Sequence, residues 1–212
     1  MPPGPVRAVV LLAHGGKSKS TAPAAPWQTP ALRMYPFLLD LARAGRSGGL
    51  LAVQLRYRVR GYNGGDPVDD VRWALDRLAV HAAPVCLLGH SMGGRACLRA
   101  AGHPGVVAVA GLAPWLPPDE PVDQLAGRRV LLVHGRADRV TDPAGSRAFA
   151  VRARSVAARL TEVEIAGAGH AMLRRPQLWH ALARSFCLAA VGLGEEDPRL
   201  TGPVDGDGIV QL

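Results

Sequence analysis

The stretch Val85-Cys86-Leu87-Leu88-Gly89-His90-Ser91-Met92-Gly93-Gly94 decides the fold that we expect for this chain of 212 residues. Its apolar residues 85–88 predict a short buried strand, and the small residues from 92 to 101 predict a helix. Between them, residues 89–93 match the pattern G-x-S-x-G, which places a serine at a sharp turn from strand to helix. Glycines two positions before and after Ser91 relieve crowding at such a turn, and the helix N-terminus directs free N–H groups at developing negative charge. Since about one shuffled sequence in ten would contain the bare pattern, the strand-turn-helix context carries the prediction.

Outward from this turn, short apolar runs alternate with longer amphipathic ones, which is typical of a parallel sheet covered by helices. We expect strands at 6–13, 50–57, 85–88, 106–112, 130–133 and 161–165. Helices are expected to begin at the capping signals Thr29, Asp66 and Asp142, each followed by a proline, and at Met92 and Pro176. The sequence therefore predicts an α/β fold, a three-layer sandwich with about six mostly parallel strands in one domain, residues 1–193.

The last segment, residues 194–212, has a different composition. It is acidic and rich in Gly and Pro, so we expect a flexible tail, although Ile209-Val210-Gln211-Leu212 could dock onto the domain.

Composition and charge exclude several classes of function. No apolar run approaches the roughly 20 residues that cross a bilayer, and the N-terminus lacks the pattern of a secretory leader, so we expect a cytoplasmic protein that does not bind membranes. The net charge of +8 comes from dispersed arginines, with Lys17 and Lys19 as the only lysines, and we expect no nucleic-acid partner. The three cysteines lie in apolar segments without C-x-x-C spacing, which predicts buried reduced thiols rather than a metal site: Cys86, Cys97 and Cys187.

A serine hydroxyl needs a base to become a nucleophile. His170 is the best candidate, because it lies in the glycine-containing loop 166–172 that follows the last predicted strand. His14 and His134 each end a strand before a glycine and are expected to be turn residues, and His90 should point away from its neighbour Ser91. The remaining histidines lie in or beside predicted helices: His81, His103 and His180.

The base in turn needs an acid that fixes its tautomer and stabilises its charged form. Asp138 lies in the loop that follows the strand 130–133. Ser91 and His170 also follow predicted strands, so all three are expected at the carboxyl edge of the sheet. Asp142 is the competitor, but its position before Pro143 fits a helix cap better. Asp119 and Asp123 are the fallback candidates.

Three motifs together resemble an α/β hydrolase: Gly-His-Ser-Met-Gly-Gly at 89–94, His-Gly-x-x-Asp at 134–138 and Gly-x-Gly-His at 167–170. The resemblance spans about residues 6–191 and agrees with the chain order Ser, Asp, His. In that family, the His-Gly turn after the first core strand contributes to the oxyanion hole. His14-Gly15-Gly16 matches this turn, so the resemblance implies that the N–H of Gly16, or of Lys17, acts together with that of Met92.

Two departures from the family matter for the site. The chain begins at what would be the third family strand, so the two leading strands are expected to be absent. Asp138 follows Ser91 by only 47 positions, which leaves no room for a helical cap domain. We therefore expect an open site walled by the loops 17–27, 58–65 and 114–119. Beside Met92, the candidate substrate-binding residues are Lys17, Trp27, Tyr62 and Trp115.

These residues predict acyl transfer from an ester-type, small-molecule substrate to water, without a metal or organic cofactor. The same triad could instead act on a thioester, peptide or lactone, or run a cyclisation or elimination, because function belongs to the site rather than the fold. A ligand-binding protein without catalysis and an interaction protein that uses the arginine-rich surface are the alternatives of another class. The sequence leaves the substrate and the oligomeric state open.

Overall fold

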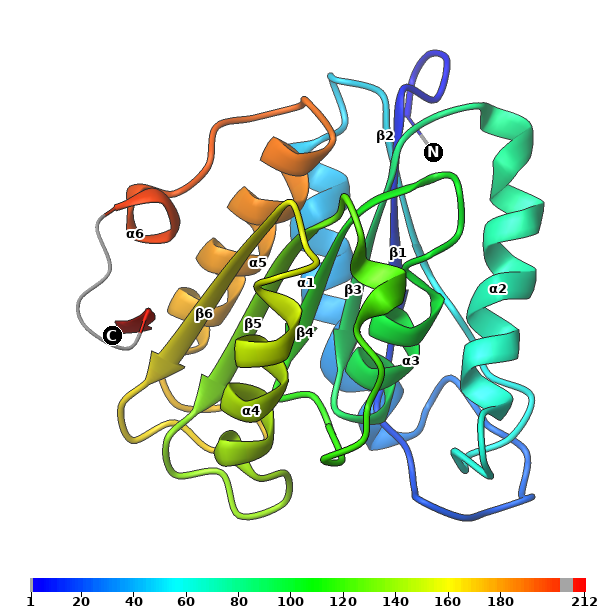
Figure 1. The fold of residues 1–212 in the computed structure, drawn as a ribbon. Helices are drawn as coiled ribbons and strands as arrows, with labels where there is room; N and C mark the ends of the chain where they lie inside the picture. Colours follow the sequence, from blue (N-terminus) through cyan, green and yellow to red (C-terminus); the bar gives the residue numbers. More distant parts are fainter. Residues whose placement is uncertain (1, 203–207) are drawn as a thin grey trace.

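The computed structural model describes residues 2–202 and 208–212. In this part of the chain, seven parallel strands form one open sheet in the order β2-β1-β3-β4-β5-β6-β7 (Figure 1). The strands are β1 (Ala8–Ala13), β2 (Leu50–Gln54), β3 (Val85–His90), β4 (Val106–Leu112), β5 (Arg129–Gly135), β6 (Arg159–Ile165) and β7 (Ile209–Gln211). Because all strands run in the same direction, the loops that follow them meet at one edge of the sheet, where open α/β sheets bind their ligands.

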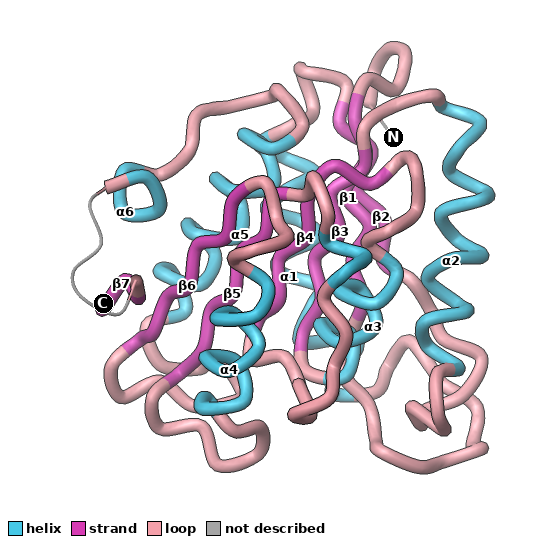
Figure 2. The backbone as a smooth tube through the Cα atoms, viewed as in Figure 1, coloured by secondary structure: helices cyan, strands magenta, loops and turns pink. Residues whose placement is uncertain are grey.

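Helices cover both faces of the sheet (Figures 1 and 2). One face carries α1 (Thr29–Ala44) and α5 (Pro176–Ala190), and the other carries α2 (Asp66–Leu78), α3 (Met92–Ala100) and α4 (Pro143–Ala153). The central strands are buried on both faces, which explains why their sequences are continuously apolar rather than alternating. On the α1 side, Met34, Phe37 and Leu41 form the buried stripe of an amphipathic helix. The predicted three-layer sandwich is therefore confirmed.

In its described residues, the C-terminal segment differs from the flexible tail expected from the sequence, and residues 209–212 dock onto the domain, which was the alternative left open. The chain forms α6 (Pro198–Thr201) and β7 there, so that the sheet has seven strands rather than about six. Leu200 and Ile209 are buried, and Glu196 forms ion pairs with Arg129 and Arg159. Pairing with β6 creates this strand, and three residues are too short to show a readable period. Residues 203–207, which the same prediction covered, lie outside the described residues.

The carboxyl edge of the sheet has no helical cap between β4 and β5. The connecting residues, 113–128, contain one short 3-10 helix, Asp123–Leu125. None of the described helices has the length and apolar character needed to span a membrane. The three cysteines are free and buried, as predicted.

Candidate active site

Ser91 occupies a strained turn between β3 and α3. Its backbone has φ 56° and ψ −120°, a region that residues with side chains rarely adopt. A Cβ at Gly89 would collide with the carbonyl of Gly93, and a Cβ at Gly93 would collide with the carbonyls of Ala13 and His14. Glycine is therefore required on both sides of the serine, for the steric reason expected from the sequence.

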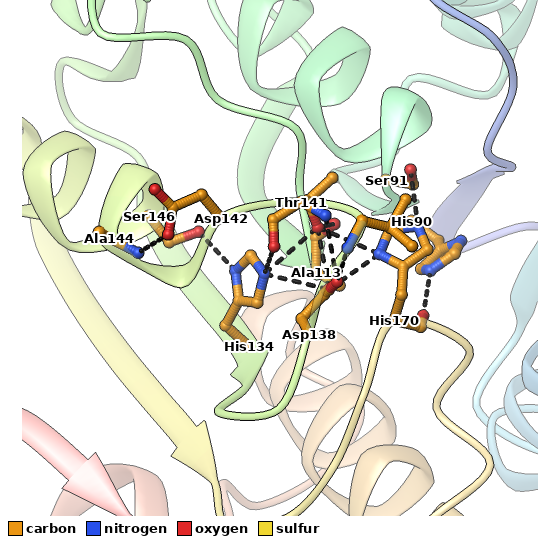
Figure 3. A network of polar contacts seen from close by, with 11 residues as sticks. His90, Ser91, Ala113, His134, Asp138, Thr141, Asp142, Ala144, Ser146 and His170 are labelled. Carbon is orange, nitrogen blue, oxygen red and sulfur yellow. Dashed lines mark hydrogen bonds and ion pairs between the residues drawn. The ribbon is translucent and has the colours of Figure 1, made fainter.

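His170 lies in the loop between β6 and α5 and contacts both other members of the expected triad (Figure 3). Its Nε2 lies 3.0 Å from Oγ of Ser91, and its Nδ1 lies 2.8 Å from Oδ2 of Asp138. A carboxylate only accepts hydrogen bonds, so Nδ1 carries the hydrogen and Nε2 of the neutral ring has its lone pair free. The structure thus brings the three side chains together in the tautomer that a general base requires.

Asp138 is buried in the loop after β5 and is held from both sides. Its Oδ1 accepts hydrogen bonds from the backbone N–H groups of Val140 (2.8 Å) and Thr141 (3.1 Å). Burial by itself would raise the pKa of Asp138, but hydrogen bonds from His134, His170 and these backbone groups hold it well below its ordinary value. The carboxylate therefore stays ionised beside the imidazole at neutral pH.

The competing aspartate has the role expected from its position. Asp142 caps α4, and its side chain accepts a hydrogen bond of 2.9 Å from the backbone N–H of Ala144. Of the carboxylates in the described part of the chain, Asp138 is the one that hydrogen-bonds to His170.

Two residues that contact the acid were missed by the sequence reasoning. Thr141 places its hydroxyl 2.9 Å from Oδ2 of Asp138, and His134 places Nε2 3.2 Å from the same oxygen. The other nitrogen of His134 lies 2.8 Å from Oγ of Ser146, so the ring is fixed at both ends (Figure 3). The spacing Asp-x-x-Thr was a usable signal for Thr141, because such residues commonly form local side-chain hydrogen bonds. His134 was expected to be a turn residue, and no local signal points from it to the acid.

His90 is oriented toward the loop of the base. Its Nε2 donates a hydrogen bond of 2.9 Å to the carbonyl oxygen of His170, and the two rings lie 4.8 Å apart. Burial, and then the nearby ring of His170, lower the pKa of His90 to about 3. The ring is therefore uncharged at neutral pH and helps to hold the loop that carries the base.

The two residues expected to form the oxyanion hole flank the serine. Met92 opens α3, so its N–H has no acceptor within the helix. Gly16 follows β1, and a Cβ at Gly16 would collide with the side chain of Met92 and the carbonyl of Arg60. The N–H of Lys17, the other possible donor, is already bonded to the carbonyl of Arg60 at 2.9 Å. The structure therefore favours Gly16 over Lys17 as the partner of Met92.

The four residues expected to bind substrate lie in different surroundings. Trp27 is 75% exposed, and the ring of Tyr62 is only 4% exposed. The guanidinium of Arg95 lies 4.1 Å from the ring centre of Tyr62 and 4.7 Å from that of Trp115, so these aromatic rings belong to a packed cation–π cluster. Lys17 is exposed in the loop after β1. Tyr62 has almost no surface to offer a substrate, and its expected role is not supported.

Comparisons with known proteins address the fold. No protein-family model matches the sequence, and no curated protein is detectably similar to it. Among solved structures, Est1E from Butyrivibrio proteoclasticus is similar with a TM-score of 0.64 and 14% identity, over 90% of each chain. An α/β serine hydrolase homologue from Coxiella burnetii has a TM-score of 0.62 and 20% identity, over 86% of each chain. A serine hydrolase without a lid from Xanthomonas campestris has a TM-score of 0.60 and 18% identity, over 89% of this chain and 84% of its own.

These identities are too low to transfer an activity, but the agreement in structure covers nearly the whole chain. Together with the strand-turn-helix at Ser91 and the absence of a helical cap between β4 and β5, they show that this chain has the fold of the α/β hydrolases, in a form without a lid.

Proposed function

We propose that the protein is a serine hydrolase that cleaves a carboxylic ester through an acyl-enzyme. One observation carries the proposal: an unbroken line of hydrogen bonds runs from Ser91 through His170 to Asp138, with distances of 3.0 and 2.8 Å. Such a line is what an acyl-transfer triad needs, since the base must reach the hydroxyl while the acid holds the base in position.

The first half of the reaction forms the acyl-enzyme. Oγ of Ser91 attacks the ester carbonyl while its proton passes to Nε2 of His170, and Asp138 stabilises the resulting imidazolium. The backbone N–H groups of Gly16 and Met92 stabilise the oxyanion, and each such donor contributes about a hundredfold or more to the rate. When the intermediate collapses, Nε2–H of His170 protonates the leaving alkoxide, so that an alcohol departs.

The second half repeats these steps with water. His170 takes a proton from a water molecule, whose oxygen attacks the acyl carbonyl, and the carboxylic acid leaves as Ser91 recovers its proton. The steps use groups of this chain, the ester and one water molecule. Activity on thioesters or lactones would require the same residues, so substrate screening decides between these classes.

Hydrolysis of a panel of p-nitrophenyl esters tests the proposal. We expect turnover by the wild type and a loss of at least about three orders of magnitude in Ser91→Ala. Ser185→Ala is the matched control, because Ser185 lies in α5 and bonds to the carbonyl of Leu182. Turnover in Ser91→Ala close to that of the control would contradict the proposal. Turnover restricted to thioesters or lactones would keep the triad and replace the ester class.

A further inference from the structure

A hollow of about 300 Å³ opens between the first turns of α1 and the carboxyl ends of β1 and β2. This volume is at the lower end of the roughly 300–1,000 Å³ of ligand pockets. Its walls are mostly apolar and include His14, Ala31, Leu32, Tyr35, Leu38 and Leu55. None of the binding residues expected from the sequence lines it.

Two consecutive residues link the hollow to the nucleophile, although Ser91 itself does not line it. His14 is one of its walls, and a Cβ placed on the next residue, Gly15, would lie 3.3 Å from the Cβ of Ser91. The segment that follows β1 therefore borders the hollow at His14 and lies next to the serine at Gly15. The same strand end leads to Gly16, whose N–H is the proposed oxyanion donor.

The order of the strands separates this hollow from the base. Ser91 follows β3, His170 follows β6, and the hollow lies at β1 and β2 on the other side of the serine. The leaving oxygen must reach Nε2 of His170 to receive its proton, so the leaving group is directed toward β6. The carbonyl oxygen is directed to the N–H groups of Gly16 and Met92, so the acyl chain takes the remaining direction, away from His170. The hollow at β1 and β2 lies on that side of Ser91.

A second hollow lies next to His170, on the side where we place the leaving group. It is shallow and open, about 490 Å³ in volume, and is bordered by His170, Val140, Leu173 and two arginines. Val140 and Leu173 are 71% and 79% exposed. This side offers an open surface for a leaving group, whereas the hollow at α1 is the smaller and more enclosed of the two.

The walls of the enclosed hollow also indicate the polarity of its occupant. Burial lowers the pKa of His14, so this ring is uncharged at neutral pH. Arg56 is the charged residue among the described residues of the wall, and its exposed position leaves its charge in water. A volume of about 300 Å³, at the lower end of the range of ligand pockets, favours a chain of medium length over a long one.

We propose that this hollow is the acyl pocket and that it takes an uncharged aliphatic acyl chain of medium length, such as hexanoyl. This inference rests on the proposed ester hydrolysis at Ser91 and adds its substrate class. Ethyl hexanoate and hexyl acetate test it, because they are isomers in which the long chain lies on the acyl or on the alcohol side. We expect kcat/KM to be at least tenfold higher for ethyl hexanoate, since each buried methylene adds up to about fourfold.

A pair of variants on one helix locates the effect. Leu32 is 54% exposed at the hollow, so Leu32→Trp can fill the space with little risk to folding. We expect this variant to lower kcat/KM for ethyl hexanoate at least tenfold and to leave hexyl acetate within twofold. Leu39→Trp is the control, because Leu39 is also in α1 and partly exposed but does not border this hollow. It should leave both esters unchanged.

The outcomes distinguish this inference from the function on which it rests. Preference for hexyl acetate would assign the pocket to the alcohol and overturn the inference, as would equal effects of the two tryptophans on ethyl hexanoate. Phosphonate labelling of Ser91 without turnover of either ester would also contradict it, while leaving the nucleophile in place. Absence of both labelling and turnover would remove the proposed function and this inference together.

Discussion

Asp138 and Glu120 are both buried carboxylates in loops that follow neighbouring strands, β5 and β4, but they bind different donors. Oδ2 of Asp138 faces two imidazoles, those of His170 at 2.8 Å and His134 at 3.2 Å. Glu120 instead forms ion pairs with two guanidinium groups of α3. Burial is common to both sites, so the type of donor must account for any difference in their chemistry.

Glu120 forms its ion pairs with Arg95 at 2.6 Å and Arg99 at 2.8 Å. A guanidinium does not release its proton in proteins, whereas an imidazole gains and loses one near neutral pH. Arg95 also packs against Tyr62 and Trp115, which fixes this cluster further. We infer from these donors that the cluster of Glu120 is structural, whereas the cluster of Asp138 serves the proposed proton transfer. Matched variants in the two clusters distinguish these roles.

The largest expected effect is on the base. His170→Ala removes the proton acceptor from Ser91, and we expect kcat/KM for ester hydrolysis to fall by at least about 10³-fold, because triad members act as a unit. The thermal melting temperature should stay close to that of the wild type. Activity within tenfold of the wild type would remove His170 from the mechanism.

The next largest effect is expected at Asp138. Asp138→Asn keeps the shape of the side chain but replaces an acceptor with an amide that can donate to Nδ1 of His170, which favours the wrong tautomer. We expect kcat to fall about 10³- to 10⁴-fold. Stopped assays with enzyme at micromolar concentration can measure the residual rate. A loss smaller than tenfold would mean that another group orients the imidazole.

Glu120→Gln is the matching change in the structural cluster. It leaves the charges of Arg95 and Arg99 without a buried partner, so we expect the free energy of unfolding to fall by about 3 kcal/mol. The kcat/KM value should stay within about threefold of the wild type. Urea denaturation and ester assays on one preparation measure both quantities, and Asp119→Asn, at an exposed neighbour, is the control. A large loss of activity without a loss of stability would contradict the distinction between the clusters.

The smallest effect is a pH dependence of stability. The pKa of His90 is about 3 in the folded protein, against 6.5 as its ordinary value. Between these values only the unfolded chain binds the proton, so the free energy of unfolding falls as the pH drops from about 6.5. One such group contributes about 1.4 kcal/mol per pH unit, and the lowered pKa of His14 acts in the same direction.

Urea titrations at pH 7, 6, 5 and 4 measure this slope. His90→Gln should make stability less dependent on pH by about one proton. An unchanged slope would show that His90 takes up its proton in the folded protein. That result would mean that His90 is protonated in the folded protein, whereas we infer that its ring is neutral and holds the loop of His170 in place.

The sequence predicted the parts of the site that depend on local patterns. The turn at Ser91 requires a strand, two glycines and a helix within ten residues, and all of these are visible in the chain. His170 and Asp138 were found by their positions after strands, since parallel strands bring their carboxyl ends to one edge. The cap at Asp142 was likewise readable from the following proline.

The remaining features depend on contacts between distant segments. The strand β7 exists because it pairs with β6, and its three residues have no pattern of their own. Tyr62 and Trp115 resemble pocket residues in composition, but Arg95 packs against them in the folded chain. The hollow at α1 was missed because the residue after β1, the end of β2 and the first turns of α1 line it together only in the folded chain, and no local pattern of the sequence indicates this.

Covalent labelling with a fluorophosphonate, followed by peptide mapping, tests whether Ser91 is the nucleophile. We expect one adduct per chain, on the peptide that contains Ser91, and no adduct in Ser91→Ala. Labelling of a different residue, or labelling that persists in Ser91→Ala, would contradict the assignment of Ser91 as the nucleophile.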